Sequence, residues 1–229
     1  MNMTQAINLS KSKILNQIQC PRRLWLEQYN PELEEPSVEM DTVLDNEAYV
    51  ADIAKRLFSS GQAIHINSRR GLRSAIDQTH AALAENGNTP IFDATFEFDG
   101  VQVQVDILDR SNPTPKAIEV KCADEIVDSF IDDCAIQAWT MEQLGMNDIS
   151  IAIAHAPRSA AFENAASFSD VFTETDVTAQ VRQRATDVAR IADAARAVLA
   201  SLEQPRADVG DQCTRRYPCP FLDYCAAGT

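Results

Sequence analysis

Two acidic residues and a lysine near the middle of the chain have the types and spacing of a metal-dependent hydrolytic site. Glu119 and Lys121 are two residues apart in a run with strand character, so their side chains project from the same face of a strand. Asp106 lies near the end of the preceding predicted strand. Two carboxylates that meet at a sheet edge can hold Mg²⁺ or Mn²⁺, and the backbone carbonyl of Val120 could be a further oxygen ligand. Such a site would position a water molecule to attack a phosphodiester.

A more ordinary explanation of this pattern is open as well. Glu119 and Lys121 could form a solvated ion pair on the surface of a sheet, and a pattern as short as Asp…Glu-x-Lys arises often by chance. Asp93, on the first strand of the same predicted hairpin, is a candidate for a carboxylate behind the direct metal ligands. The choice between the two explanations depends on other parts of the sequence.

The cysteines form a second pattern. Three of them recur as C-x5-C-x5-C near the end of the chain and a fourth stands alone near its beginning; the four are Cys20, Cys213, Cys219 and Cys225. Four thiolates suit a [4Fe–4S] cluster or a tetrahedral zinc ion. The tail from residue 211 is polar and too short to build a core, so we expect it to fold around a bound metal centre. Cys122 and Cys134 lack such spacing and are expected to be packed as small apolar residues.

The periodicity of the apolar residues predicts the elements that position these side chains. Strands are expected over residues 91–98, 101–108, 116–121 and 149–155, with a tight turn at 99–100. Helices are expected over residues 11–19, 22–29, 42–58, 72–85, 129–144 and 176–202. In the second strand, strict alternation would place Val105 and Ile107 on one face, and Asp106 and Leu108 on the other. The order of elements indicates a mixed α/β domain with a central sheet.

Taken together and in order, these residues resemble the RecB-like nucleases of the PD-(D/E)XK superfamily. The residues that carry the resemblance are Cys20, Asp106, Glu119-Val120-Lys121, Gln137, Cys213, Cys219 and Cys225. More narrowly, the chain is similar to the iron–sulfur branch that includes the CRISPR-associated Cas exonuclease and the AddB nuclease domain, and it looks closest to an uncharacterised relative of that branch. The resemblance spans nearly the whole chain and is strongest in residues 9–33, 118–137 and 210–225.

The resemblance implies a single nuclease-like domain over residues 1–229 with a restriction-endonuclease-like α/β core. The catalytic core would be 90–155, and residues 1–40 and 205–229 would together form the lobe of a structural [4Fe–4S] cluster. The implied activity is that of a Mg²⁺- or Mn²⁺-dependent deoxyribonuclease, an exonuclease on single-stranded DNA or DNA ends. Lys121 would orient the attacking water, and Gln137 would support the site or stand as a solvent-exposed amide.

Three departures from the family pattern keep an alternative open. Met141 stands where the Gln-x-x-x-Tyr motif has its tyrosine, and Ala51 stands where active relatives carry a metal-binding histidine. The first two tail cysteines are five residues apart, where the CRISPR branch has two. His65 could replace the missing histidine, although a lone polar histidine on a strand is the commoner case. The alternative is a weak or inactive module of the same fold that binds nucleic acid or a protein partner; a zinc-stapled regulatory protein is a third.

Charge limits how this chain could contact DNA. The 20 Lys and Arg against 34 Asp and Glu give a net charge of −14, whereas a protein that wraps DNA by charge alone should be basic. Basic residues gather beside Cys20 and Cys213, where we expect a strand-binding passage lined by Lys11, Lys13, Arg22, Arg23, Arg215 and Arg216. Residues 31–52 hold eight acids and no base, a solvated face or a surface for a protein partner. The polar start and the lack of a membrane-length apolar run predict a cytoplasmic protein.

Overall fold

A mixed β-sheet occupies the centre of the computed structural model, which describes residues 7–35, 38–58, 62–85, 87–157, 159–160, 162, 165–214 and 218–228. Within these residues the sheet has seven strands in the order β2-β3-β4-β5-β6-β7, and β1 pairs with β4 beside this path. The pairs β1–β4, β2–β3 and β5–β6 are parallel, and the other pairs are antiparallel. The predicted α/β class with a central mixed sheet is therefore confirmed.

Most predicted elements are present with ends shifted by a few residues. The strands are β1 (Leu9–Ser10), β2 (Ile64–His65), β3 (Ile91–Phe98), β4 (Val101–Asp109), β5 (Lys116–Cys122), β6 (Ser150–Ala156) and β7 (Thr173–Asp176). The helices are α1 (Lys11–Gln19), α2 (Pro21–Tyr29), α3 (Val38–Leu57), α4 (Leu72–Ala84), α5 (Asp128–Gln143), α6 (Thr178–Ala185), α7 (Val188–Ala200) and α8 (Leu222–Ala226). The strands β1, β2 and β7 have two to four residues, which is too short for a periodic signal in the sequence.

The single long helix predicted over residues 176–202 is wrong. The chain forms α6 and α7 instead, and they are separated by Thr186 and Asp187. The Thr186 hydroxyl donates a hydrogen bond to the Gln183 carbonyl at 2.8 Å. A Thr side chain that bonds to its own backbone turn competes with the helical pattern, and this gives a physical reason for the break.

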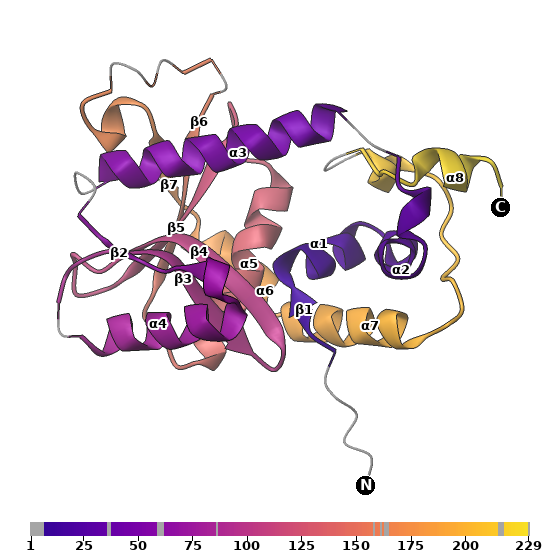
Figure 1. The fold of residues 1–229 in the computed structure, drawn as a ribbon, viewed down its shortest axis with the longest axis horizontal. Helices are drawn as coiled ribbons and strands as arrows, with labels where there is room; N and C mark the ends of the chain where they lie inside the picture. The colour runs from indigo at the N-terminus through magenta and orange to yellow at the C-terminus, as the bar shows by residue number, and fades with distance from the viewer. Residues whose placement is uncertain are drawn as a thin grey trace, which may run out of the picture.

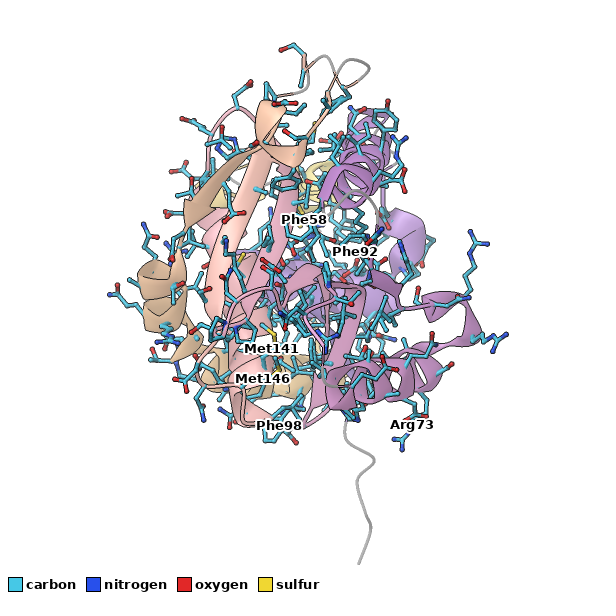
Figure 2. All side chains as sticks on the ribbon, turned by 90° about the vertical axis from the view of Figure 1, so that its left-hand side faces the viewer. Phe58, Arg73, Phe92, Phe98, Met141 and Met146 are labelled. Atoms are coloured by element: carbon cyan, nitrogen blue, oxygen red, sulfur yellow. The ribbon has the colours of Figure 1, made fainter. Side chains whose placement is uncertain are left out.

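Helices cover both faces of the sheet (Figure 1). α3 lies across one face, where Val50, Ile53 and Ala54 pack on apolar residues of β3, β4, β5 and β6. On the opposite face the larger core receives side chains from α1, α4, α5, α6 and α7. Figure 2 shows Phe58, directly after α3, near Phe92 of β3, and their ring centroids are 6.4 Å apart.

The tight turn between β3 and β4 forms as predicted. Asp99 and Gly100 have φ values of 48° and 71°. Two successive positive φ angles belong to the turn type that matches the twist of a two-residue hairpin. The antiparallel pairing then runs from Phe98 and Val101 back to Ile91 and Leu108.

The faces of the hairpin strands reverse at Asp106, so the strict alternation expected there is wrong. Val105 joins the larger core, but Ile107 packs beneath α3 and Leu108 joins the larger core in its place. The ladder pairs Phe92 with Ile107 and Ala94 with Val105. Asp93 and Asp106, which lie opposite one another between these pairs, are not part of the ladder. Asp93 has a φ of 60°, and this unusual backbone angle gives a physical reason for the reversal.

The first helices and the tail of the chain lie side by side at one end of the molecule (Figure 1). Trp25, Leu26 and Phe221 form a small core there. The Trp25 indole N–H donates to the Ser201 carbonyl at 2.9 Å, and the Glu35 backbone N–H donates to the Pro220 carbonyl, also at 2.9 Å. In the described part of the chain, no helix is long and apolar enough to cross a membrane.

Candidate active site

Two carboxylates come together where β4 and β5 separate. The last paired residues of the two strands are Ile107 and Ile118, and the next positions along the ladder are Asp106 and Glu119. Beyond this point β5 continues along β6, whereas β4 continues along β3 on its other side. We call the gap between β4 and β5 beyond Ile107 and Ile118 the fork. Asp106 and Glu119 stand at its mouth.

The backbone of Val120 faces the fork. Its N–H donates to Oδ2 of Asp106 at 2.9 Å, since β4 no longer offers a ladder partner. In an extended strand the N–H and C=O of one residue point to the same side. The Val120 carbonyl oxygen is therefore directed toward the fork as well, and the site gathers two carboxylates and a carbonyl.

On the α5 side of the fork, two lysines each form ion pairs with the carboxylates of Glu119 and Asp133. Lys121 Nζ lies 2.8 Å from Glu119 Oε1 and 2.7 Å from Asp133 Oδ2. Lys11 Nζ lies 3.2 Å from Glu119 Oε1 and 2.8 Å from Asp133 Oδ1. Because Glu119 is 5% and Lys121 is 7% exposed, the explanation of these two as a solvated surface pair is wrong. We call Lys11, Lys121, Glu119 and Asp133 the charge cluster.

Gln137 holds the other oxygen of Glu119. Its Nε2 donates to Glu119 Oε2 at 2.6 Å and to the Gln104 carbonyl at 3.2 Å. The side chain is 1% exposed, so the explanation of Gln137 as a solvent-exposed amide is wrong. The Gln104 side chain in turn donates to Asp93 Oδ1 at 2.7 Å. A chain of hydrogen bonds thus joins Glu119 to Asp93.

Short stretches of sequence explain how helices deliver these groups. Leu9 pairs with Val101 of β4 and is fully buried, so β1 fixes the chain beside the fork. Ser10 then caps α1 by accepting a hydrogen bond from the Lys13 backbone N–H at 3.3 Å, and Lys11 is the first residue of that helix. On α5, Asp133 and Gln137 are four residues apart and both face β5, as helical spacing requires.

Burial makes Asp106 a weak acid. Loss of water contact, followed by the nearby charge of Glu119, raises the pKa of Asp106 to about 7. The positive charge of Lys11 and the hydrogen bond from Val120 oppose this shift without cancelling it. Two acids held this close in a buried place repel one another until a proton or a cation is shared between them.

The charge cluster keeps its lysines protonated. Burial lowers the pKa of Lys121, but the charges of Asp133, Glu119 and Glu47 outweigh burial and hold the pKa well above its usual value. Burial raises the pKa of Asp133, but Lys11 and Lys121 outweigh it and hold that pKa far below its usual value. Asp133 is therefore ionised at neutral pH, and both lysines beside it are protonated.

Sequence reasoning missed three groups at this site. The one indication of Asp133 in the sequence is its four-residue spacing from Gln137. Gln104 contributes a backbone carbonyl, and no sequence motif indicates this. Glu47 of α3 belongs to the acidic run 31–52, yet its charge acts on Lys121. Lys11, expected in a strand-binding passage, lies in the charge cluster with its side chain 24% exposed.

Asp93 and His65 lie on the α3 side of the sheet. Asp93 forms an ion pair with Lys55, and both border an open pocket of about 360 Å³ that His65 also lines. The His65 ring meets the Phe92 ring edge-on at 5.0 Å. Ala51 packs against the apolar residues between α3 and the sheet, so its position on α3 faces the sheet.

Met141, at the position of the missing tyrosine, is packed in the larger core. Its side chain is fully buried, and Figure 2 shows it within the body of the molecule near Met146. A tyrosine there would have a polar hydroxyl to satisfy, whereas the thioether needs no partner.

All four cysteines of the second pattern line one pocket. Cys20, Cys213, Cys219 and Cys225 surround it together with Arg22 and Arg23. The Cys219 backbone N–H donates to the Cys213 carbonyl at 2.8 Å, which folds the tail back on itself. Among the residues that the structure describes, no three His, Cys, Asp or Glu side chains are arranged to hold a metal ion. Cys134 is fully buried and Cys122 packs against the apolar residues between α3 and the sheet, so their expected role as packed residues is confirmed.

The basic residues of the expected passage are dispersed. Lys13 donates to Gln28 at 3.3 Å, and the Arg22 guanidinium lies 5.4 Å from the centre of the Tyr224 ring. Arg23 donates to Gln19 and borders the cysteine pocket. The remaining two, Arg215 and Arg216, lie outside the described residues. The passage remains a prediction.

No protein-family model matches this sequence, and a comparison with curated proteins finds no similar sequence. Among solved structures the chain is similar to SSO0001, with a TM-score of 0.42 and 16% identity, covering 97% of this chain and 87% of that one. It is also similar to a "Putative exonuclease" from Eubacterium rectale, with a TM-score of 0.46 and 14% identity, covering 91% of this chain and 88% of that one. At these scores neither likeness carries an argument about function, which has to rest on the geometry of the fork.

Proposed function

We propose that this protein is a divalent-metal-dependent deoxyribonuclease that degrades single-stranded DNA or DNA ends. The observation that carries the proposal is the meeting of Asp106, Glu119 and the Val120 carbonyl at the fork, with Lys121 beside them. A sequence pattern that could arise by chance corresponds here to one site, in which Glu119 and Lys121 are buried and Asp106 is partly buried. The resemblance to RecB-like nucleases supplies the reaction class.

The oxygen donors at the fork fit Mg²⁺ or Mn²⁺. Magnesium is usually bound by one or two carboxylates and keeps several waters, and its remaining positions are available to substrate phosphate. Two carboxylates and one carbonyl match that need, and a cation between the two acids would offset their mutual repulsion. A bound cation would polarise the phosphoryl oxygen and lower the pKa of a bound water.

The protein side chains would do the positioning. Gln137 fixes Oε2 of Glu119, which keeps the carboxylate from rotating. Lys121 remains protonated and lies next to Glu119, where its ammonium can orient the attacking water and stabilise negative charge that develops on the phosphate. Asp93 would support the site through Gln104 without touching the metal.

We further propose that Cys20, Cys213, Cys219 and Cys225 hold a structural [4Fe–4S] cluster. Their common pocket supports this ligand set. Four thiolates suit either a zinc ion or a four-iron cluster, and the resemblance to the iron–sulfur branch favours the cluster.

A second candidate function is a weak or inactive module of the same fold that binds DNA or a protein. Two observations favour it: Met141 replaces a polar tyrosine in the core, and Lys121 is engaged with both Glu119 and Asp133. On this view the acids of residues 31–52 would contact a basic partner protein.

Cleavage of end-labelled single-stranded DNA separates the two candidates. With Mn²⁺ the wild-type protein should shorten the DNA, and Glu119→Gln should reduce the rate by about a hundredfold or more, because a metal ligand is lost. Glu97→Gln, an exposed acid on β3, is the matched control and should cleave like the wild type. A wild-type protein that binds the DNA but leaves it intact would establish the second candidate instead.

A further inference from the structure

We infer that Lys11 is a positioning residue: it balances Glu119 and Asp133 so that Lys121 can turn toward the reacting phosphate. This inference rests on the proposed nuclease function, because it assigns a role within that reaction. Lys11 lies more than a hundred residues from the Glu-Val-Lys strand in sequence, and only the fold brings it to the site.

The geometry of the charge cluster is nearly symmetrical. Each lysine contacts Oε1 of Glu119, and each contacts a different oxygen of Asp133. The two ammonium groups therefore do the same electrostatic work in the resting protein. Of the two lysines, Lys121 alone lies on β5 beside the proposed metal ligands Glu119 and Val120. It is therefore the lysine that can contact the attacking water and the phosphate.

The anchoring of Lys11 is built into the fold. β1 pairs with β4 at Val101 and Gln102, the Ser10 side chain caps α1, and Lys11 follows at once. The buried Leu9 and Ile14 hold this segment on either side of the lysine. The strand and the capped helix hold the backbone of Lys11 in place, so its ammonium group is confined more closely than that of a lysine in a surface loop.

Charge balance explains what Lys11 would do. Without its positive charge, Lys121 would be the sole counter-ion of two buried carboxylates, and an unbalanced buried charge is costly. Lys121 would then be held more tightly and would reach the phosphate less often. Removing Lys11 would also remove a positive charge that opposes a cation at Glu119. The inference therefore predicts slower turnover together with tighter metal binding.

The test uses the full-length protein with Lys11→Met, Lys11→Arg and Lys116→Met. Mn²⁺ affinity is measured on the protein alone from the electron paramagnetic resonance of free Mn²⁺, and kcat and KM are measured on end-labelled single-stranded DNA. Lys11→Met should bind Mn²⁺ about threefold to tenfold more tightly and turn over about tenfold more slowly, with KM little changed. Lys11→Arg keeps the charge and should stay nearer the wild type. Lys116, paired with Glu174 at the far end of β5, is the matched control.

A double variant separates charge balance from simple loss of structure. Lys11→Met with Asp133→Asn leaves Lys121 with one carboxylate, Glu119. Lys121 then no longer has to balance two carboxylates, so much of kcat should return. If Lys11→Met turns over normally or binds Mn²⁺ more weakly, or if the double variant stays as slow as the single one, the inference is overturned. A wild-type protein that does not cleave DNA overturns the proposed function, whatever the Lys11 variants do.

Discussion

Asp106 is influenced by two kinds of neighbour that act in opposite directions. Burial and the charge of Glu119 favour its protonated form, while Lys11 and the Val120 N–H favour the carboxylate. The first pair prevails, and the pKa rises from 3.8 to about 7. At neutral pH its carboxyl group is therefore close to half protonated in the metal-free protein.

A change of pH should reveal this balance in the metal-free protein. Between about pH 4 and pH 7 the folded chain keeps the Asp106 proton and the unfolded chain does not, so the free energy of unfolding should fall as pH rises. Asp106→Asn cannot lose a proton there and should be more stable than the wild type by about 1–3 kcal/mol at pH 8. The difference should be small near pH 3.5, where Asp106 is protonated in the folded chain and largely protonated in the unfolded chain.

Urea unfolding in the presence of a chelator at pH 3.5, 6 and 8 measures this difference. Asp124→Asn removes an exposed acid just after β5 and should show no such trend. A stability difference between Asp106→Asn and the wild type that stays constant across the three pH values would contradict the raised pKa of Asp106.

Among the elements, the β3–β4 hairpin depends most clearly on one backbone conformation. Gly100 has a φ of 71°, and a Cβ atom there would lie 3.3 Å from Oδ1 of Asn8. Gly100→Ala should therefore lower the free energy of unfolding by about 1–2 kcal/mol, since alanine is strained at positive φ. Gly87→Ala is the matched control, because nothing lies within 4 Å of its Cβ position. Equal thermal stability of the two variants would be the contrary result.

The sequence allowed the elements and the centre of the site to be predicted because both depend on local order. Alternation and the Asp-Gly turn predict the β3–β4 hairpin, and the two-residue spacing of Glu119 and Lys121 predicts that they share a face. The reversal at Asp106 could not be foreseen, because it follows from an unusual φ at Asp93 on the neighbouring strand. The contacts of Lys11 with Glu119 and Asp133 could not be predicted either. These partners are distant in sequence, and β1, which places Lys11, has two residues.

At the scale of the whole molecule, the tail needs something besides apolar burial to hold it. Among the described residues after α7, Phe221 is the one large apolar side chain that is fully buried, whereas Leu202 is 84% exposed. Ordering a residue costs about 1.5 kcal/mol in conformational entropy, and the proposed metal centre would supply the missing stability.

Single cysteine replacements test that source. Cys20→Ser should lose most of its iron and sulfide, expose the tail to proteolysis and lower the melting temperature, because one ligand of the proposed cluster is removed. Cys122→Ser, which changes a thiol outside the cysteine pocket, should keep its full iron content. Normal iron content in Cys20→Ser would contradict the ligand set, and zinc in place of iron in the wild type would contradict the cluster.

Helix α1 gives the molecule a property that neither site has alone. It begins with Lys11 and is followed directly by Cys20, so the charge cluster and the cysteine pocket share one rigid element about 13 Å long. If the proposed iron–sulfur cluster forms, a shortage of iron or an oxidant that destroys it would release one end of this helix and so disturb the lysine at the other. The proposed nuclease would then lose activity although every carboxylate is intact, and its activity would depend on the supply of iron.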